Sequence, residues 1–234
     1  MDNKHISQQF NVELEDVKNK VMTMGGLVET NVKNAITALV DGNVELGERV
    51  VNEDFKVNAL EVSIDEQCMQ IIARRQPTAS DLRLVMMIVK TITDIERIGD
   101  EAEKIARMAI ELADMERPKD QYREIKHLGD HVRKMLHDSL DAFARTDIEA
   151  ALDCAAEDEK IDAEYEAAVR QMITLMMEDT RNVRRVLNTL WSARALERIG
   201  DHSKNICEYV IYMVKGRDVR HTTLEQMQQE ALGK

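Results

Sequence analysis

Apolar residues recur every three or four positions along almost the whole chain, which is the spacing of one face of an α-helix. Five breaks divide this pattern into six segments of roughly 25 to 38 residues, which predict six long helices. Because the connections between them are short, consecutive helices should be antiparallel. The breaks lie at Asp41-Gly42-Asn43, Gln76-Pro77-Thr78, Arg117-Pro118, Arg145-Thr146-Asp147 and Glu178-Asp179-Thr180.

The third and sixth predicted helices repeat one another at a shift of 101 residues. Glu96-Arg97-Ile98-Gly99-Asp100 is identical at all five positions to Glu197-Arg198-Ile199-Gly200-Asp201. The preceding helices repeat at a shift of 104, where Glu53-Asp54 falls on Glu157-Asp158. An internal repeat of this length indicates a duplicated supersecondary unit. We therefore predict an all-α fold of two tandem, pseudo-symmetric three-helix bundles.

The boundary between the two copies is predicted at Pro118, because proline ends one helix and can open the next. The first unit then spans residues 1–117 and the second spans residues 118–216. Residues 217–234 form a polar tail, for which we predict a short or frayed helix.

The composition supports this prediction and narrows the function. Aromatic residues are only 3% of the chain and there are two prolines, which is typical of long helices and not of strand-and-turn folds. The net charge of −12 disfavours nucleic acid and anionic lipid as partners. No apolar stretch approaches the ~20 residues of a membrane span, and the first residues do not resemble a signal peptide. The three cysteines, an odd number far apart in helical segments, are expected to be reduced. We expect a soluble cytoplasmic protein.

The repeated motif places two carboxylates on one helix face. Glu96 and Asp100 are four residues apart, as are Glu197 and Asp201, at the point where an apolar seam turns acidic. The glycine before each aspartate allows another backbone or a ligand to approach closely. The second helix of each copy supplies possible partners, Asp54 with Asn58 and Asp158 with Asp162.

Three interpretations of these carboxylates remain open. A hard divalent or trivalent metal ion, such as Mn, Fe, Mg or Zn, prefers several carboxylate oxygens. Alternatively, arginines such as Arg97 and Arg198 neutralise them, or the face is simply exposed and solvated. If a metal binds, Asn58 in place of Asp162 predicts a weaker site in the first copy.

The sequence contains few motifs that are typical of enzymes. The chain has no phosphate-binding P-loop, no G-x-S-x-G and no dinucleotide-binding loop. A carboxylate-bridged metalloenzyme on a helical bundle remains an alternative, although such sites use paired E-x-x-H motifs and only Glu124 to His127 fits.

Two segments resemble the signatures of the PhoU family. They are Gln76 to Arg83 followed by Asp94 to Asp100, and Ala193 to His202, and the similarity covers roughly residues 8 to 215. The resemblance implies two three-helix bundles, frequent homodimers, and multinuclear metal sites in some members. It places metal ligands at Glu96, Asp100, Glu197 and Asp201, with support from Asp54, Asp158 and Asp162.

The resemblance also implies a function. PhoU proteins link the ATPase subunit of the phosphate ABC transporter to a sensor histidine kinase, and they damp the phosphate-starvation response when phosphate is plentiful. The chain is accordingly expected to be a non-enzymatic signalling adaptor that meets the membrane only through its partners.

Overall fold

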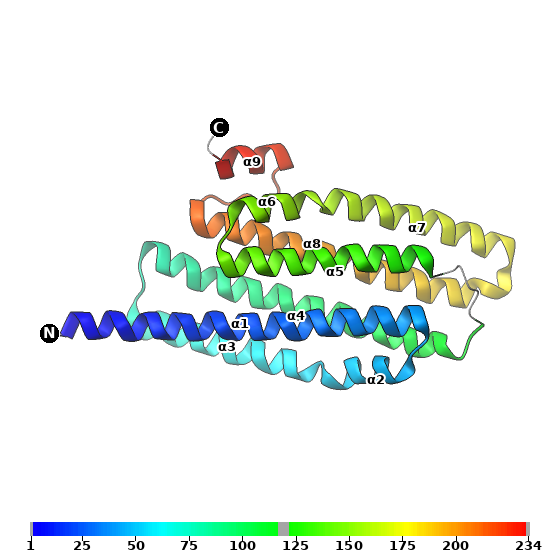
Figure 1. The fold of residues 1–234 in the computed structure, drawn as a ribbon, viewed down its shortest axis with the longest axis horizontal. Coiled ribbons are helices and arrows are strands. Elements are labelled where there is room, and N and C mark those ends of the chain that lie inside the picture. The colour runs from blue at the N-terminus through cyan, green and yellow to red at the C-terminus, as the bar shows by residue number, and fades with distance from the viewer. Residues whose placement is uncertain (1, 117–121, 233–234) are drawn as a thin grey trace.

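The computed structural model describes residues 2–116 and 122–232, and within them every regular element is helical. One bundle is built from the first part of the chain and a second is stacked against it (Figure 1). The first bundle comprises α1 (Asp2–Asp41), α2 (Val44–Glu53), α3 (Phe55–Arg75) and α4 (Ala79–Ala113). The second comprises α5 (Arg123–Arg145), α6 (Ile148–Ala156), α7 (Asp158–Glu178), a single 3-10 turn (Thr180–Asn182) and α8 (Val183–Lys215). The all-α prediction is confirmed.

Four of the five predicted breaks coincide with helix ends, and the fifth, at Arg117-Pro118, lies outside the described residues. The connection between the first two helices of each copy shows the repeat at atomic detail. Asn43 Oδ1 accepts a hydrogen bond from Leu46 N, and its counterpart Asp147 accepts one from Ala150 N, each at 3.1 Å. Both side chains therefore satisfy a free amide at a helix start.

The middle helix of each copy is divided in two, which the prediction of six helices did not include. The helical ladder is interrupted at Asp54 between α2 and α3, and at Glu157 between α6 and α7. Aspartate and glutamate at these positions do not continue the apolar face. The hydrophobic seam nevertheless runs straight through the first break, because Val50, Val57 and Ile64 are spaced by seven and are all buried.

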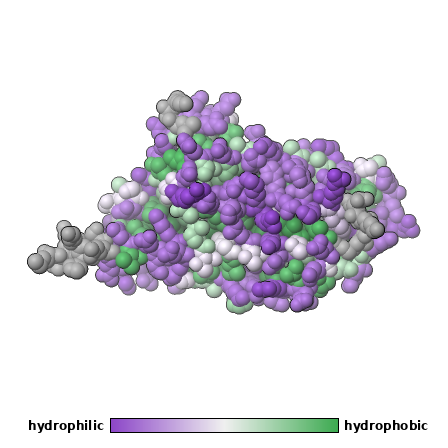
Figure 2. Space-filling model, in the orientation of Figure 1, coloured by the Kyte–Doolittle hydropathy of each residue, from purple (hydrophilic) through white to green (hydrophobic). Residues whose placement is uncertain are grey.

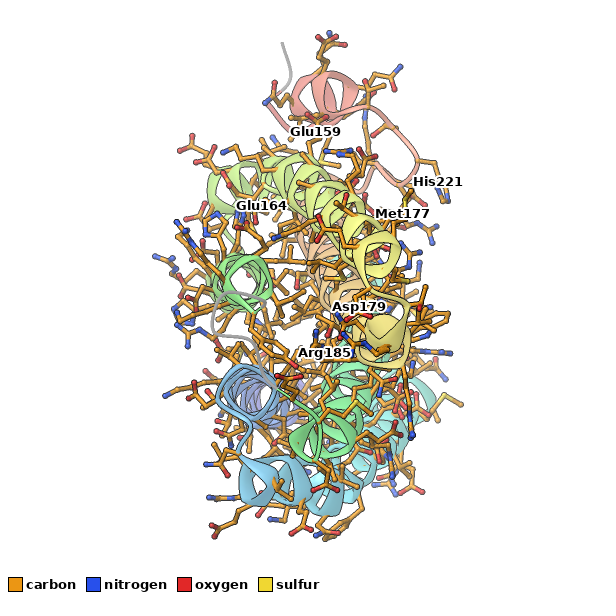
Figure 3. The ribbon with its side chains drawn as sticks, turned by 90° about the vertical axis from the view of Figure 1, so that its right-hand side faces the viewer. Glu159, Glu164, Met177, Asp179, Arg185 and His221 are labelled. Carbon is orange, nitrogen blue, oxygen red and sulfur yellow. The ribbon has the colours of Figure 1, made fainter. Side chains whose placement is uncertain are left out.

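The two bundles meet through equivalent helices. α4 packs on α8 and α1 packs on α5, so the third and first helices of each copy form the centre of the molecule (Figure 1). An end-on view shows α1 and α5 in one column and α4 and α8 in the other (Figure 3). Buried apolar side chains from α1, α4, α5 and α8 fill the space between these helices.

Polar contacts join the two bundles along α4 and α8. Arg198 Nε lies 3.0 Å from Glu101 Oε1, and His202 Nδ1 lies 2.7 Å from the buried Asp94. Arg185 reaches from α8 toward the first bundle (Figure 3), where it donates to the backbone carbonyl of Glu116 at 2.9 Å. These pairs fix how the two halves are aligned along their length.

The C-terminal tail contains a further helix, α9 (Leu224–Leu232), which packs on α6 and α8. Met227 and Ala231 of α9 are buried, as is Val219 before it, so the tail is docked and not frayed over this range. Hydrophilic residues cover most of the face shown in Figure 2. Cys68, Cys154 and Cys207 are buried and free, as predicted. In the described part of the chain, no helix combines the length and apolarity that a membrane span requires.

Candidate functional site

The first acidic cluster lies where α3 packs against α4. Glu96 and Asp100 project from α4, and Asp54 lies in the break before α3. Burial raises the pKa of Asp54, and the negative charges of Glu103 and Asp100 raise it further. Burial likewise raises the pKa of Glu96, followed by the charges of Asp100 and Glu61. The structure therefore brings the predicted residues together and adds two carboxylates, Glu61 and Glu103.

The second cluster lies at the equivalent place between α7 and α8. Burial raises the pKa of Glu197 to about 7, and the charges of Asp201, Asp162 and Asp158 act in the same direction. Asp158 and Glu197 are buried, with 5% and 8% of their surface exposed. The four carboxylates predicted for the second copy therefore lie near enough to one another for the other three charges to act on Glu197.

The cations of the second cluster are not those that the sequence suggested. Arg194 Nη1 donates to Glu197 Oε1 at 2.5 Å, and Lys204 Nζ donates to Asp158 Oδ2 at 2.6 Å. Arg198 instead pairs with Glu101 of the first bundle. Neutralisation by Arg198 is thus wrong for this cluster, and two other cations take that role.

The first cluster has weaker neutralisation. Arg97 Nε lies 3.9 Å from Glu96 Oε2, which is at the limit of an ion pair. Asp54 accepts a hydrogen bond from Asn58 Nδ2 at 3.1 Å, so the asparagine supplies a neutral donor to that carboxylate. Arg107 pairs with Glu103 at 2.5 Å, so one of the two added carboxylates has a cation of its own.

The motif glycines allow the two helices of each site to pack closely. A Cβ at Gly200 would lie 3.3 Å from Ile161 Cγ2, which is a tight contact. A Cβ at Gly99 would lie 3.4 Å from Val57 Cγ1 and 3.5 Å from Asp54 Oδ1. Gly99 therefore leaves room for the side chains of Val57 and Asp54, and Gly200 leaves room for that of Ile161.

The donor set fits a hard cation in its chemistry. Glu197 Oε2 is buried and has no hydrogen-bond partner, and a buried carboxylate oxygen of this kind is costly without a ligand. Among the described residues, no three His, Cys, Asp or Glu groups lie close enough together to hold an ion as the side chains are placed. Binding would require these carboxylates to turn toward a common centre.

Sequence reasoning missed the residues that distinguish the two sites, although their spacing contained the signal. On the third helix of each copy, positions spaced 3, 4 and 3 lie along one face. These positions are Thr93, Glu96, Asp100 and Glu103 in the first copy, and Arg194, Glu197, Asp201 and Lys204 in the second. Extending the motif by one turn in each direction would have revealed the two cations.

Comparison with known proteins assigns both bundles to one family. The family model described as the PhoU domain matches residues 21–109 and again residues 125–210. The chain is 52% identical to the phosphate-specific transport system accessory protein PhoU of Escherichia coli K12, over 99% of this chain and 96% of that protein. It is also 52% identical to the PhoU homolog of Pseudomonas aeruginosa, over 97% of this chain and 93% of that protein.

Solved structures agree with the sequence match. The crystal structure of PhoU from Pseudomonas aeruginosa superimposes with a TM-score of 0.87 at 50% identity, covering 89% of this chain and 100% of that chain. The phosphate transport system regulatory protein PhoU from Streptococcus pneumoniae gives a TM-score of 0.82 at 30% identity, covering 90% and 99%. The chain therefore belongs to the PhoU family, whose members are accessory and regulatory proteins of phosphate transport and not enzymes.

Proposed function

We propose that this protein is a negative regulator of phosphate uptake and of the phosphate-starvation response. In this role it is a cytoplasmic adaptor between the ATPase subunit of the phosphate ABC transporter and a sensor histidine kinase. The observation that carries the proposal is the match of both bundles to the PhoU domain, together with relatives named as accessory or regulatory proteins of phosphate transport. Two stacked bundles of long helices offer extended faces for two partners.

Deletion of the gene tests the regulatory role. A strain without the protein should express its starvation genes in phosphate-rich medium, because the damping signal is lost. A reporter for a starvation promoter measures this, with the same strain carrying the wild-type gene as the control. Starvation genes that stay silent in the deletion strain would contradict the role.

The partners can be identified separately. We expect a tagged protein to capture the transporter ATPase subunit and the histidine kinase from detergent-solubilised membranes of phosphate-rich cells. The same experiment on cytoplasm alone should not yield them. We also expect a homodimer, and light scattering that finds only a monomer at micromolar concentration would contradict it.

We further propose that the two acidic clusters bind a hard divalent or trivalent metal ion. Glu96, Asp100 and Asp54 would hold it in the first bundle, and Glu197, Asp201, Asp158 and Asp162 in the second. The unpartnered Glu197 Oε2 and the raised pKa values of Glu96 and Asp54 support this, because a cation would relieve the repulsion between these carboxylates. The ion would supply positive charge that holds α3 on α4 and α7 on α8.

Metal binding is tested by elemental analysis and calorimetric titration of the purified protein with Mn, Fe, Mg and Zn salts. A variant with Glu96, Asp100, Glu197 and Asp201 all changed to alanine should lose the bound metal. It should also lose the thermal stabilisation that a ligand of the folded state provides. The metalloenzyme alternative predicts oxidase or hydrolase activity in the metal-loaded wild type, which the adaptor proposal does not.

A further inference from the structure

A cavity separate from the acidic clusters lies between the beginning of α4 and the end of α8. Its volume is about 330 Å³, which is within the range of small-ligand sites. The two helix ends that form it lie side by side at the left of Figure 1. Its lining includes Leu82, Arg83, Met86, Lys90, Glu208 and Tyr209.

The walls of this cavity are mainly apolar and aromatic. Leu82 and Met86 line it with 39% and 42% of their surface exposed, so they are open to an incoming molecule. Tyr209 adds an aromatic ring from α8. Apolar walls with a few polar groups are typical of sites for small organic molecules, and methionine adapts its shape to such ligands.

Arg83 is a cation without a counter-ion on this wall. It makes no ion pair or hydrogen bond with any described residue, and its Nε atom is buried without a partner. The guanidinium carbon would lie 3.6 Å from a Cβ at Gly216, the glycine that ends α8 with φ of 70°. The side chain is therefore held against the end of α8 and is not free in solvent.

Lys90 is the second cation on this wall without an ion pair, and its charge reaches Asp218 only at longer range. Its Nζ lies 5.7 Å from the centre of the Tyr209 ring, and no carboxylate is within ion-pair distance. Among the other lysines and arginines whose burial the structure describes, those without an ion pair are exposed, apart from Arg185, which donates to the carbonyl of Glu116. The two half-buried cations that lack a carboxylate partner thus line the same cavity.

The carboxylates on the cavity wall do not compensate Arg83. Asp218 is held by Arg220, which donates to it from Nη2 at 2.5 Å. Burial raises the pKa of Glu208 to about 7, so this group is only partly ionised at neutral pH. A half-buried arginine that is left uncompensated is unfavourable unless a counter-ion comes from outside the chain.

We propose that this cavity binds a small amphipathic anion, an apolar or aromatic molecule that carries one acidic group. The apolar body lies against Leu82, Met86 and Tyr209, and the acidic group pairs with Arg83, close to Lys90. This site does not depend on the metal clusters or on the regulatory role proposed above. It would allow the protein to respond to a soluble molecule.

The probe for the test is 1-anilinonaphthalene-8-sulfonate, whose aromatic rings carry one sulfonate and whose fluorescence rises in apolar sites. We expect saturable binding of one probe per chain. Arg83→Gln should weaken it by roughly tenfold or more, the usual worth of a charge-assisted hydrogen bond. N-phenyl-1-naphthylamine, which lacks the sulfonate, should bind Arg83→Gln and wild type with affinities within roughly twofold of each other.

Arg184→Gln is the matched control, because Arg184 is the repeat counterpart of Arg83, is exposed and lies outside the cavity. It should bind the sulfonate probe as the wild type does. Met86→Glu adds a negative charge at the half-exposed rim and should also weaken binding, which provides a second test if Arg83→Gln unfolds. Equal binding of the sulfonate probe by wild type, Arg83→Gln and Met86→Glu would overturn the proposal.

Discussion

At the scale of single residues, the charged groups of this protein differ in which other charged groups lie close to them. Glu197 and Glu208 are both buried on α8, and burial raises the pKa of each to about 7. Glu197 shares its site with three other carboxylates, whereas Glu208 lies beyond that cluster toward the cavity. The sequence did not single out Glu208. The chain has 44 acidic residues, and a single glutamate outside a repeated motif does not stand out among them.

The stability of the protein should depend on pH through Glu208. The folded state raises its pKa from 4.5 to about 7, so the folded chain binds this proton more tightly than the unfolded chain. The free energy of unfolding therefore falls as pH rises between these two values and stays low above them. Glu208→Gln, which cannot ionise, should be more stable than wild type at pH 8 by roughly 1–2 kcal/mol and similar to it at about pH 4.

Urea unfolding at the two pH values measures this difference. Glu225→Gln is the control, because Glu225 is exposed on α9 and makes no ion pair among the described residues. The same gain for Glu208→Gln at both pH values would show that its ionisation is not the cause.

At the scale of helices, the contact between α1 and α5 repeats the internal symmetry. A Cβ at Gly25 would meet Leu140 at 3.1 Å, and a Cβ at the counterpart Gly129 would meet Ile36 at 3.0 Å. Since Leu140 is the repeat counterpart of Ile36, the two halves make the same contact on each other. Glycine is needed here for close approach of two helices.

Adjacent glycines give a matched test of this contact. Gly26→Ala has no atom within 4 Å of the added Cβ, so it should raise the free energy of unfolding by about 0.5–1 kcal/mol through helix propensity. Gly25→Ala gains the same propensity but crowds Leu140, so it should be destabilising by roughly 1 kcal/mol overall. Urea unfolding compares the two, and equal stability would mean that the helices separate at little cost.

The helices also show how far the sequence could predict the structure. Their type, their order and four of the breaks between them were predictable, because apolar periodicity and turn residues are local signals. The breaks at Asp54 and Glu157 were not, since the seam of Val50, Val57 and Ile64 keeps a seven-residue period across the first of them. The site carboxylates were predictable from the repeat, whereas contacts between different helices, such as Lys204 with Asp158, depend on packing.

At the scale of the whole molecule, the two bundles share a fold but differ in the charge of their acidic clusters. The sequence predicted a weaker first site because Asn58 replaces Asp162. The structure adds a second difference between the clusters, in the cations next to the carboxylates, and this one acts in the opposite direction. In the second site Glu197 and Asp158 already have cations at 2.5 and 2.6 Å, whereas in the first site the nearest cation to Glu96 is at 3.9 Å.

We therefore predict that a metal ion binds more tightly at the first cluster than at the second. A cation entering the second cluster must displace Arg194 and Lys204 or bind beside them, which costs Coulomb energy. Glu96→Ala with Asp100→Ala should remove more bound Mn, Fe or Zn than Glu197→Ala with Asp201→Ala. Calorimetric titration and elemental analysis of the two variants measure this.

Exchanging the residues that differ between the copies isolates the cause. Lys204 has Glu103 as its counterpart, and Lys204→Glu removes the cation that pairs with Asp158, so it should strengthen metal binding in the second cluster. Glu103→Lys should weaken the first cluster for the same reason, and it places a lysine near Asp54, as Lys204 lies near Asp158. Asn58→Asp instead gives the first cluster the carboxylate that the second cluster has at Asp162. If Asn58→Asp raises the affinity of the first cluster more than Lys204→Glu raises that of the second, the number of carboxylates and not the neighbouring cations sets the difference between the two sites.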